Sequence, residues 1–448
     1  MRDPQASLNF EADKVVRRLR MPLAPSHFLR SVLARRWVEE GHLVPFEILD
    51  EYTVTSPLYS FVTQPSEWCD AQLFEAGQLT LALQQQAVAE GFDLKDASAW
   101  NVIFDGLRPV FCDLMSFVAL DSRKWWAAGQ FARHFVLPLV VAQRRGLRAC
   151  EVFKVWRDGL PPAVGRQMLG WSRYLTRYWP LVAAADDRAA LRSAQPPAAE
   201  SRDDDPASIT RFRRGLQASL SWMLDGVRPA HSTASTRQGA WLGYVSHRSH
   251  YPGSSVDRKR ETIAAWLAQV RPAWVADLGC NDGEFSAIAL ESGAHVVAID
   301  SDHACIDALF RRQSASDRLF PVIAVLDDLN RGRGWAGTEY TGLTERLAQR
   351  VDLVMMLALV HHLAVGASVP LNAVAAFAAH CTRRWLIVEF IGEADPQLAL
   401  LCAQRQRTVD DFSIERQRAA FLAAGFAIED EFNLAPAART LLLLRLAS

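Results

Sequence analysis

The sequence predicts an α/β fold with an open, mainly parallel sheet in its C-terminal half, preceded by a mostly helical α+β region. After about residue 240, short runs rich in Val, Ile and Leu alternate with segments of helical periodicity. Such continuous apolar runs are typical of strands buried on both faces of a parallel sheet. Across residues 1–184, helix-like segments dominate instead. We therefore expect two parts of different architecture.

The composition is that of a globular protein with a full hydrophobic core. The chain has 448 residues, of which 50% are hydrophobic and 22% charged, and its formal net charge is -1. This balance gives no sign of a nucleic-acid or membrane partner. The seven cysteines include no CxxC pair, which argues against a disulfide framework or a zinc site. With no apolar core near the N-terminus either, we expect a soluble, cytoplasmic protein.

Composition also suggests where the parts divide. Residues 185–207 are rich in Ala, Pro, Ser, Arg and Asp and poor in large apolar side chains. Such a segment cannot bury enough surface to offset its ordering entropy, so it is a linker or a long insertion. We expect an N-terminal α+β region at 1–184, a connecting helical segment at 208–239 and the sheet domain at 240–448.

The expected strands follow one another in a regular order. Five buried runs lie at 274–279, 295–300, 320–329, 351–360 and 384–391, and two final runs, at 425–435 and 439–447, look like a closing antiparallel pair. Together they predict a sheet of about seven strands.

A glycine-containing turn follows the first strand, with the sequence Asp277-Leu-Gly279-Cys-Asn281-Asp-Gly283. The dinucleotide fingerprint GxGxxG does not fit, because Asn281 and Glu284 stand where it needs glycine. The P-loop pattern also fails, since no Lys-Ser or Lys-Thr follows. In addition, Glu284 at the start of a helix would repel a phosphate.

The turn instead resembles the first motif of class I S-adenosylmethionine-dependent methyltransferases, which is an acid followed by glycines at alternate positions. The resemblance covers roughly residues 240–448 and implies a Rossmann-like seven-stranded methyltransferase sheet that binds S-adenosyl-L-methionine. Asp277 would hold the cationic amine of the cofactor, and Gly279 and Gly283 would let the backbone approach it closely. Asn281 replaces the usual middle glycine.

Acids after the next two strands complete the expected cofactor site. Asp300 ends the second run and would accept hydrogen bonds from both ribose hydroxyls. Asp327 and Asp328 close the third run, where the family often bonds the adenine amino group. An Asp at such a position can also be a simple helix cap.

The candidate catalytic residues are His361 and His362 after the fourth strand and Glu389 in the fifth. Methyl transfer is an in-line displacement in which the enzyme aligns the nucleophile, and a base helps when that nucleophile is a hydroxyl. We favour His362 as the base or positioning group, with two structural histidines as the alternative.

The acceptor is expected to be a small molecule or a glycan-like compound, methylated at oxygen. The Asn/Asp-Pro-Pro-Tyr signature of enzymes that methylate amide or base nitrogens is absent after the fourth strand, where the sequence reads LALVHH. Tyr244, His250 and Tyr251 precede the first strand and are either lid residues or part of a capping loop.

The N-terminal half carries a second resemblance, at residues 94–117. Asp96, Asn101 and Asp113, with a hairpin between the last two, resemble the catalytic and magnesium-binding residues of protein and small-molecule kinases. The resemblance covers about residues 50–150, the kinase C-lobe. It implies that Asp96 accepts the substrate proton and that Asn101 and Asp113 hold magnesium.

This second pattern departs from the kinases in several places. Leu94 replaces the usual His, Asp-Leu-Met replaces Asp-Phe-Gly, and no glycine-rich loop or strand lysine of the kinase type precedes it. An active phosphotransferase, a non-catalytic module that binds ATP or another ligand, and a turn of no kinase ancestry remain open. No other metal site is expected.

Both segments together are similar to a bacterial two-part family in which an LKDAS-type segment precedes a methyltransferase domain, some members being described as nodulation-type methyltransferases. The RTLLLLR ending and the Glu389-Phe390 and Asp395-Pro396 pairs fit that pattern. The leading hypothesis is thus a methyltransferase with a kinase-like N-terminal region. A binding protein that has lost both activities is the remaining alternative.

Overall fold

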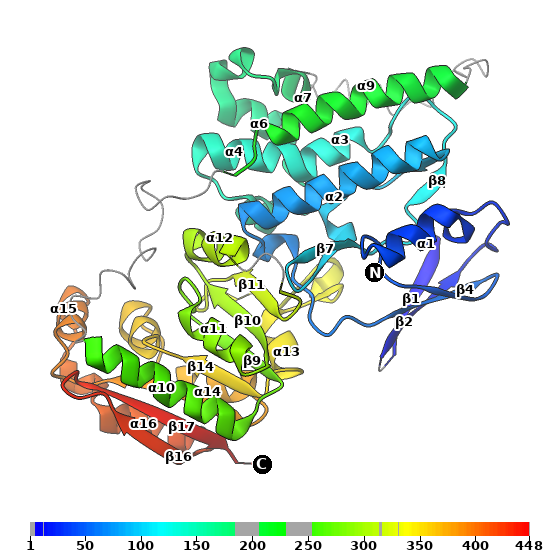
Figure 1. Cartoon of the computed structure of the whole chain (residues 1–448). Helices are drawn as coiled ribbons and strands as arrows, with labels where there is room; N and C mark the ends of the chain where they lie inside the picture. Colours follow the sequence, from blue (N-terminus) through cyan, green and yellow to red (C-terminus); the bar gives the residue numbers. More distant parts are fainter. Residues whose placement is uncertain are drawn as a thin grey trace. The chain divides into compact units, whose positions relative to one another are not determined.

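The computed structural model describes residues 5–11, 13–183, 206–229, 253–312, 316–329 and 331–447. It consists of two compact units, 1–231 and 232–448 (Figure 1). Most of the predicted linker at 185–207 lies outside the described residues.

The second unit is built on one seven-stranded sheet. Its order is β11 (Leu319–Ile323), β10 (His295–Asp300), β9 (Trp274–Leu278), β14 (Leu353–Met356), β15 (Trp385–Ile391), β17 (Arg439–Leu446) and β16 (Phe426–Asn433). The first five are parallel, and β17 and β16 are each antiparallel to the preceding neighbour. The predicted sheet with its closing antiparallel pair is confirmed. The strand order reverses at β9, since β10 and β11 lie on one side of it and β14 and β15 on the other. Open α/β sheets bind ligands at such a switch point, at the carboxyl ends of the strands.

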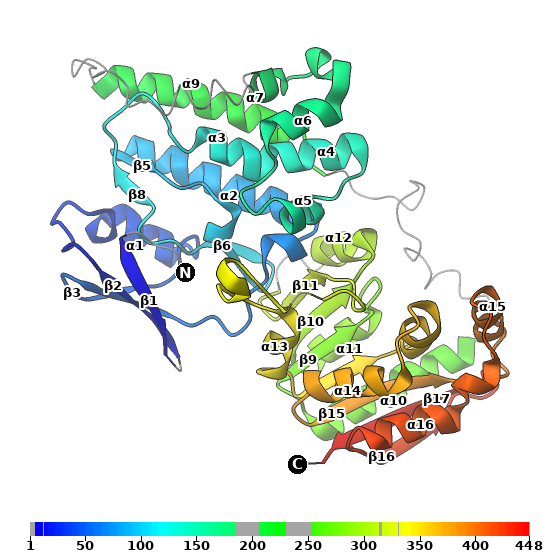
Figure 2. The same cartoon turned by 180° about the vertical axis from the view of Figure 1, so that it is seen from behind.

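Helices cover both faces of this sheet. One layer consists of α10 (Gly253–Val270), α11 (Glu284–Glu291) and α12 (His303–Arg312), and the other of α13 (Leu343–Ala348), α14 (Leu371–Cys381) and α16 (Ile414–Ala423) (Figures 1 and 2). Because the sheet lies between two layers, every residue of β9, β11, β14 and β15 is buried. This explains the continuous apolar runs of the sequence.

Two predicted strands are shorter than expected. The run at 320–329 forms a strand only to Ile323, and the run at 351–360 only to Met356. Apolar residues continue beyond both ends, but no neighbouring strand remains to pair with them. The apolar runs therefore predicted strands that are too long. After β11 the chain forms a short insertion that contains β12 (Gly332–Arg333), η7 (Trp335–Gly337) and β13 (Tyr340–Thr341).

The first unit begins with a four-stranded antiparallel sheet that the sequence analysis did not foresee. Its order is β1 (Ala6–Phe10), β2 (Lys14–Leu19), β4 (Thr53–Pro57) and β3 (Glu47–Asp50), with η1 (Phe28–Arg30) and α1 (Val32–Glu39) between β2 and β3. Charged and polar residues interrupt these short strands, so they lack the apolar runs that revealed the strands of the other sheet.

The rest of the first unit is mainly helical. The segments are η2 (Pro65–Glu67), α2 (Asp70–Ala89), β5 (Phe92–Leu94), η3 (Ala99–Asn101), β6 (Val102–Asp105), β7 (Arg108–Phe111), β8 (Phe117–Ala119), α3 (Ala128–Phe131), η4 (Ala132–Val136), α4 (Leu137–Arg145), α5 (Ala149–Val155), α6 (Pro162–Leu169), η5 (Gly170–Leu175), α7 (Trp179–Ala183) and α9 (Pro206–Asp225). The predicted hairpin is confirmed as β6 and β7, with Gly106 at φ 61° in the turn.

Helix α9 belongs to this first unit, although it comes after the undescribed stretch. It packs along α2, and Arg213 Nη2 lies 2.6 Å from Asp93 Oδ2 at the centre of the unit. Both side chains are buried, so the pair fixes α9 against the loop that carries Asp96.

Candidate functional site

The glycine turn between β9 and α11 has a positive backbone φ at three positions. Gly279, Asn281 and Gly283 have φ of 75°, 52° and 85°. A Cβ at Gly283 would overlap Leu309, and one at Gly279 would approach Leu359 Cδ1 to 3.2 Å. Asn is among the few non-glycine residues that adopt positive φ readily, which explains how Asn281 can replace the middle glycine.

Asp300, at the end of β10, holds this turn in place. Its Oδ2 accepts the backbone N–H of Asn281 and its Oδ1 that of Asp302, each at 2.8 Å. Each oxygen keeps a second lone pair, and the half-buried side chain remains accessible. Burial raises the pKa of Asp300, which these backbone hydrogen bonds partly oppose.

Asp277 lies beneath the turn rather than on its surface. It is 2% exposed, and its Oδ2 accepts a hydrogen bond of 2.7 Å from Ser286 Oγ on α11. Burial raises the pKa of Asp277 to about 6, with a smaller contribution from the charge of Asp300. The carboxyl group therefore ties β9 to α11 and sits in an environment that disfavours its own charge.

Asp327 and Asp328 occupy a different position from the one predicted. They lie in an exposed turn beyond the end of β11, not at the strand end itself. The predicted strand reached these two residues because the apolar run continues over Ala324, Val325 and Leu326.

The two histidines follow β14, in a loop that lies next to the glycine turn. Leu359 of this loop is the residue that faces Gly279, and Ala358 has a φ of 51°. His361 and His362 have ring centroids 4.0 Å apart, and a π-helical turn, His362–Gly366, begins immediately. Such turns are rare and are often found at functional sites.

His361 is 9% exposed, and its Nδ1 has no hydrogen-bond partner among the residues that the structure describes. Burial lowers the pKa of His361 well below its usual value; the neighbouring His362 and Arg439 contribute, and Glu389 opposes them. Burial also lowers the pKa of His362. Both imidazoles are therefore neutral at physiological pH.

Glu389 is fully buried within a chain of ion pairs. Its Oε2 lies 2.5 Å from Lys259 Nζ on α10, and its Oε1 lies 3.2 Å from Arg439 Nη1 on β17. Arg439 Nε is in turn 2.9 Å from Asp395 Oδ2, at the start of α15 (Pro396–Gln404). Sequence analysis named Glu389 but missed Lys259 and Arg439, which no motif marks.

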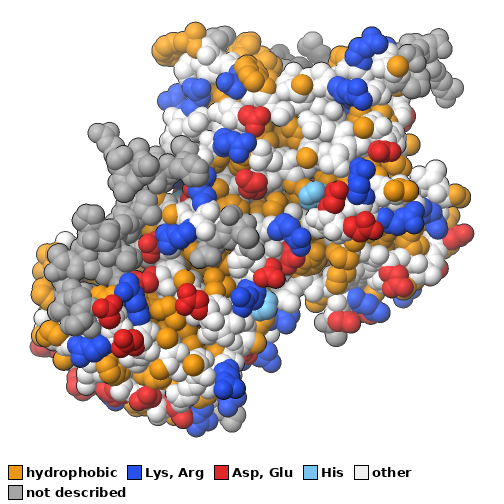
Figure 3. Space-filling view, viewed as in Figure 1, with side chains coloured by type: hydrophobic (Ala, Val, Ile, Leu, Met, Phe, Trp, Pro, Cys, Tyr) orange, Lys and Arg blue, Asp and Glu red, His pale blue; other side chains and the backbone are white. Residues whose placement is uncertain are grey.

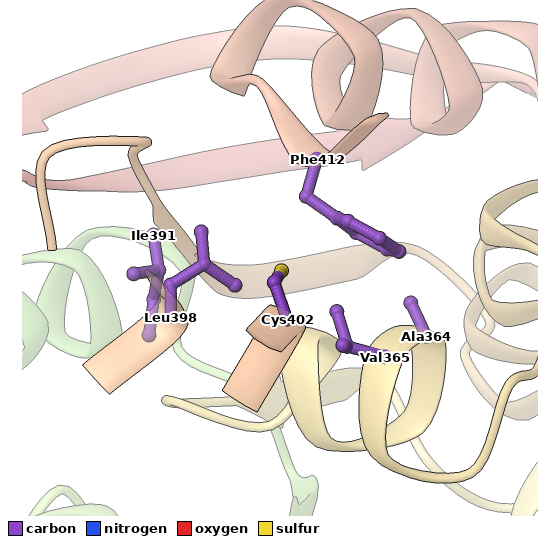
Figure 4. Close-up of a cluster of buried hydrophobic side chains, with 6 residues drawn as sticks. All are labelled: Ala364, Val365, Ile391, Leu398, Cys402 and Phe412. Atoms are coloured by element: carbon purple, nitrogen blue, oxygen red, sulfur yellow. The ribbon is translucent and has the colours of Figure 1, made fainter. Parts of the chain in front are cut away.

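An apolar cluster packs behind the histidine loop (Figure 4). It joins the π-helical turn, the end of β15, α15 and η9 (Val409–Phe412). Its members are Ala364, Val365, Ile391, Leu398, Cys402 and Phe412. The cluster fixes the backbone that follows His361, so the loop is packed on its inner side.

The kinase-like residues of the first unit also lie close together. Asn101 Nδ2 donates to the backbone oxygen of Asp96 at 3.1 Å, and the backbone oxygen of Asn101 accepts the N–H of Cys112 at 2.8 Å. Asp96 Oδ1 also accepts a hydrogen bond of 2.7 Å from Gln130 Nε2. The loop before the hairpin is thus fixed to the segment after it.

Asp113 lies at the other end of this hairpin. Its Oδ2 accepts from Ser116 Oγ at 2.5 Å, and its Oδ1 accepts the N–H of Met115 at 3.1 Å. Burial raises the pKa of Asp113; the charge of Asp96 adds to this, and Arg17 opposes it. Arg17, which sequence analysis missed, reaches from β2 to the Cys112 oxygen at 2.9 Å.

Three further expectations concern lid residues, metal ligands and membrane-spanning helices. Tyr244, His250 and Tyr251 lie outside the described residues. Within the described ranges, no group of three or more His, Cys, Asp or Glu side chains could hold a metal ion. Among the helices described, none is both long and apolar enough to span a membrane.

The strand order of the second unit, its glycine turn and the acid that ends β10 agree with the Rossmann-like seven-stranded methyltransferase sheet that the sequence predicts. The whole chain is similar to nodulation protein NoeA of Rhizobium meliloti. The two are 28% identical over 437 residues, which cover 92% of this chain and 88% of NoeA. No family model matches the chain.

Solved methyltransferase structures resemble parts of the chain. Magnesium protoporphyrin IX methyltransferase ChlM from Synechocystis, with bound S-adenosylhomocysteine, is 15% identical with a TM-score of 0.33, and the match covers 43% of this chain and 84% of ChlM. WbdD is 17% identical with a TM-score of 0.31, over 47% of this chain and 45% of WbdD.

Proposed function

We propose that this protein transfers a methyl group from S-adenosylmethionine to a hydroxyl group of a small-molecule or glycan-like acceptor. The observation that carries the proposal is the turn from Gly279 to Gly283, which Asp300 holds at the switch point of the sheet. Open α/β sheets bind ligands at this edge, and Glu284 at the start of α11 disfavours a phosphate there.

In this proposal each cofactor-binding residue has a distinct role. Asp300 accepts the ribose hydroxyls with its remaining lone pairs, because each oxygen uses only one on the backbone. The backbone from Gly279 to Gly283 lies against the amino acid part of the cofactor. The negative charge of the buried Asp277 balances the positive charge of the cofactor's amine. Asp327 and Asp328 are the proposed neighbours of the adenine.

The histidine loop is the proposed acceptor side of the site. His361 and His362 follow β14 and are linked to the glycine turn through Leu359. Glu389 is a poor candidate for the base, because its two oxygens already face Lys259 and Arg439. We assign it the role of holding these two cations behind the histidines.

Titration calorimetry with S-adenosylhomocysteine tests the cofactor site. We expect Asp300→Asn to weaken binding by about tenfold or more, since one amide oxygen cannot replace two charged ones toward the ribose. Asp317→Asn is the matched control, because that side chain is 86% exposed. Equal affinity of wild type and Asp300→Asn would contradict the assigned ribose contact.

A second candidate function belongs to the first unit. Asp96, Asn101 and Asp113 lie around one hairpin, and Arg17 reaches the same segment from the small sheet. This arrangement supports magnesium-dependent binding of a nucleoside triphosphate, with or without phosphotransfer.

A further inference from the structure

We propose that His361 is the residue that contacts the acceptor and that its Nδ1 accepts a hydrogen bond from a hydroxyl group of a neutral acceptor. This inference rests on the proposed methyltransferase function and specifies its acceptor side. It differs from the sequence-based expectation, which favoured His362.

The Nδ1 nitrogen of His361 lacks a hydrogen bond with any described residue. His361 Nδ1 is buried and has no hydrogen-bond partner in the described part of the chain. Leaving a buried polar atom unpaired costs about 1–3 kcal/mol, so native proteins rarely do so without a reason. A ligand that donates a hydrogen bond to Nδ1 would remove this cost, and the cost therefore favours binding of such a ligand.

The chemistry of this nitrogen determines which ligand group it can bind. Burial, reinforced by His362 and by the positive charge of Arg439, lowers the pKa of His361 well below its usual value, so the ring stays neutral and keeps one nitrogen lone pair free to accept. A hydroxyl group can donate to that lone pair. A carboxylate or another anion has no hydrogen to offer.

The buried charges behind the histidine loop are balanced. Lys259 and Arg439 are paired with Glu389 and Asp395, so the buried network contains two cations and two anions. Each ion faces a partner within the set, and a charged acceptor group would add an unbalanced charge to a buried region. A neutral acceptor avoids that penalty.

The geometry also suits the reaction. Leu359 places the histidine loop beside Gly279, and the apolar cluster that packs on the π-helical turn holds the loop in position (Figure 4). When His361 holds the O–H, a lone pair of the oxygen is directed to the methyl group. The oxygen–carbon bond forms as the carbon–sulfur bond breaks, and that electron pair stays on sulfur. The hydroxyl proton moves to Nδ1, and the ring gives it up to water once the methylated product has left.

The test separates the two nitrogens of the ring. An Asn side chain places its amide near the position of Nδ1, whereas a Gln side chain reaches the position of Nε2. We therefore compare His361→Asn, His361→Gln and His361→Leu, with His380→Asn as the control because His380 is exposed on α14. The full-length protein is assayed for transfer of tritiated methyl groups from S-adenosylmethionine to methyl glycosides of neutral hexoses and to methyl glucuronide.

We expect transfer to hydroxyl groups of the neutral glycosides. His361→Asn should keep most of kcat/KM, while His361→Gln and His361→Leu should lose roughly 10- to 100-fold, the effect of one missing hydrogen bond to the reacting group. Affinity for S-adenosylhomocysteine should be unchanged in all variants, which also shows that they are folded.

Three results would overturn the inference: transfer to the carboxylate of methyl glucuronide in preference to hydroxyls, no transfer to any neutral glycoside, or full activity of His361→Leu. Failure of the proposed function itself is distinguishable, because the wild-type protein would then not bind S-adenosylhomocysteine.

Discussion

At the scale of single residues, the cofactor turn shows a conflict between stability and ligand binding. Asp277 is buried in β9, where only Ser286 hydrogen-bonds its carboxyl group among the contacts described. Because the folded state raises the pKa of Asp277 to about 6, above its ordinary value, folding favours the protonated form. Ionisation of Asp277 therefore destabilises the protein as pH rises, while the same charge would attract a cationic ligand.

We predict that Asp277→Asn stabilises the protein at neutral pH and weakens cofactor binding. The stabilisation should be absent below about pH 4, where both states are protonated, and should reach about 3 kcal/mol above about pH 6. Urea unfolding between pH 4 and 8 measures it, and calorimetry with S-adenosylhomocysteine measures the loss. A gain that does not depend on pH would show that the ionisation of Asp277 is not its source.

At the scale of elements, the ion-pair chain connects parts of the sheet that lie far apart in sequence. Lys259 belongs to α10, Glu389 to β15 and Arg439 to β17, and Asp395 caps α15. All four are buried, so the pairing offsets a desolvation cost that would otherwise be several kcal/mol per ion. The chain of pairs fixes α10, the helix that precedes the sheet, to β15 and β17.

Lys259→Met should therefore destabilise the second unit by about 3–5 kcal/mol, because it leaves Glu389 buried with one cation instead of two. Hydrogen exchange of the β15 amides under increasing urea reports on this unit alone. Arg416→Met is the control; its pair with Asp411 is exposed, and such pairs contribute less than about 1 kcal/mol. Similar losses in the two variants would mean that the buried network does not stabilise the sheet.

At the scale of the whole molecule, two compact units each carry a candidate site. Positive and negative side chains are interspersed over the face of the protein in Figure 3, in keeping with a net charge of -1. The methyltransferase fold lies in the second unit, and the Asp96, Asn101 and Asp113 cluster lies in the first. Each unit has its own sheet and core, so each site can be tested while the other serves as an internal reference.

If the first unit binds a nucleotide, calorimetry should show magnesium-dependent ATP binding that Asp113→Asn abolishes and Asp105→Asn retains. Asp105 is the matched control, because it lies in the partly exposed turn of the same hairpin. Affinity for S-adenosylhomocysteine should be the same in all three proteins. Absence of ATP binding by the wild type would exclude this second function.

The parallel sheet, its closing antiparallel pair and the position of the glycine turn could all be predicted from the amino-acid sequence. These features depend on local signals, namely continuous apolar runs and residues suited to positive φ. The turn at Gly106 and helix α12 could be predicted for the same reason. The four-stranded sheet of the first unit could not, because its strands are short, polar and stabilised by partners distant in the chain.

The surroundings of the proposed reacting groups became clear only from the folded chain. It ended β11 before Asp327, paired Glu389 with Lys259 and Arg439, and left His361 Nδ1 without a partner among the described residues. Burial and pairing depend on residues far apart in the chain, such as Lys259 and Glu389, which are 130 positions apart, and no local pattern encodes them. The physical reason is that a strand's length is fixed by its neighbours, and the charge of a buried group by whatever folding brings beside it.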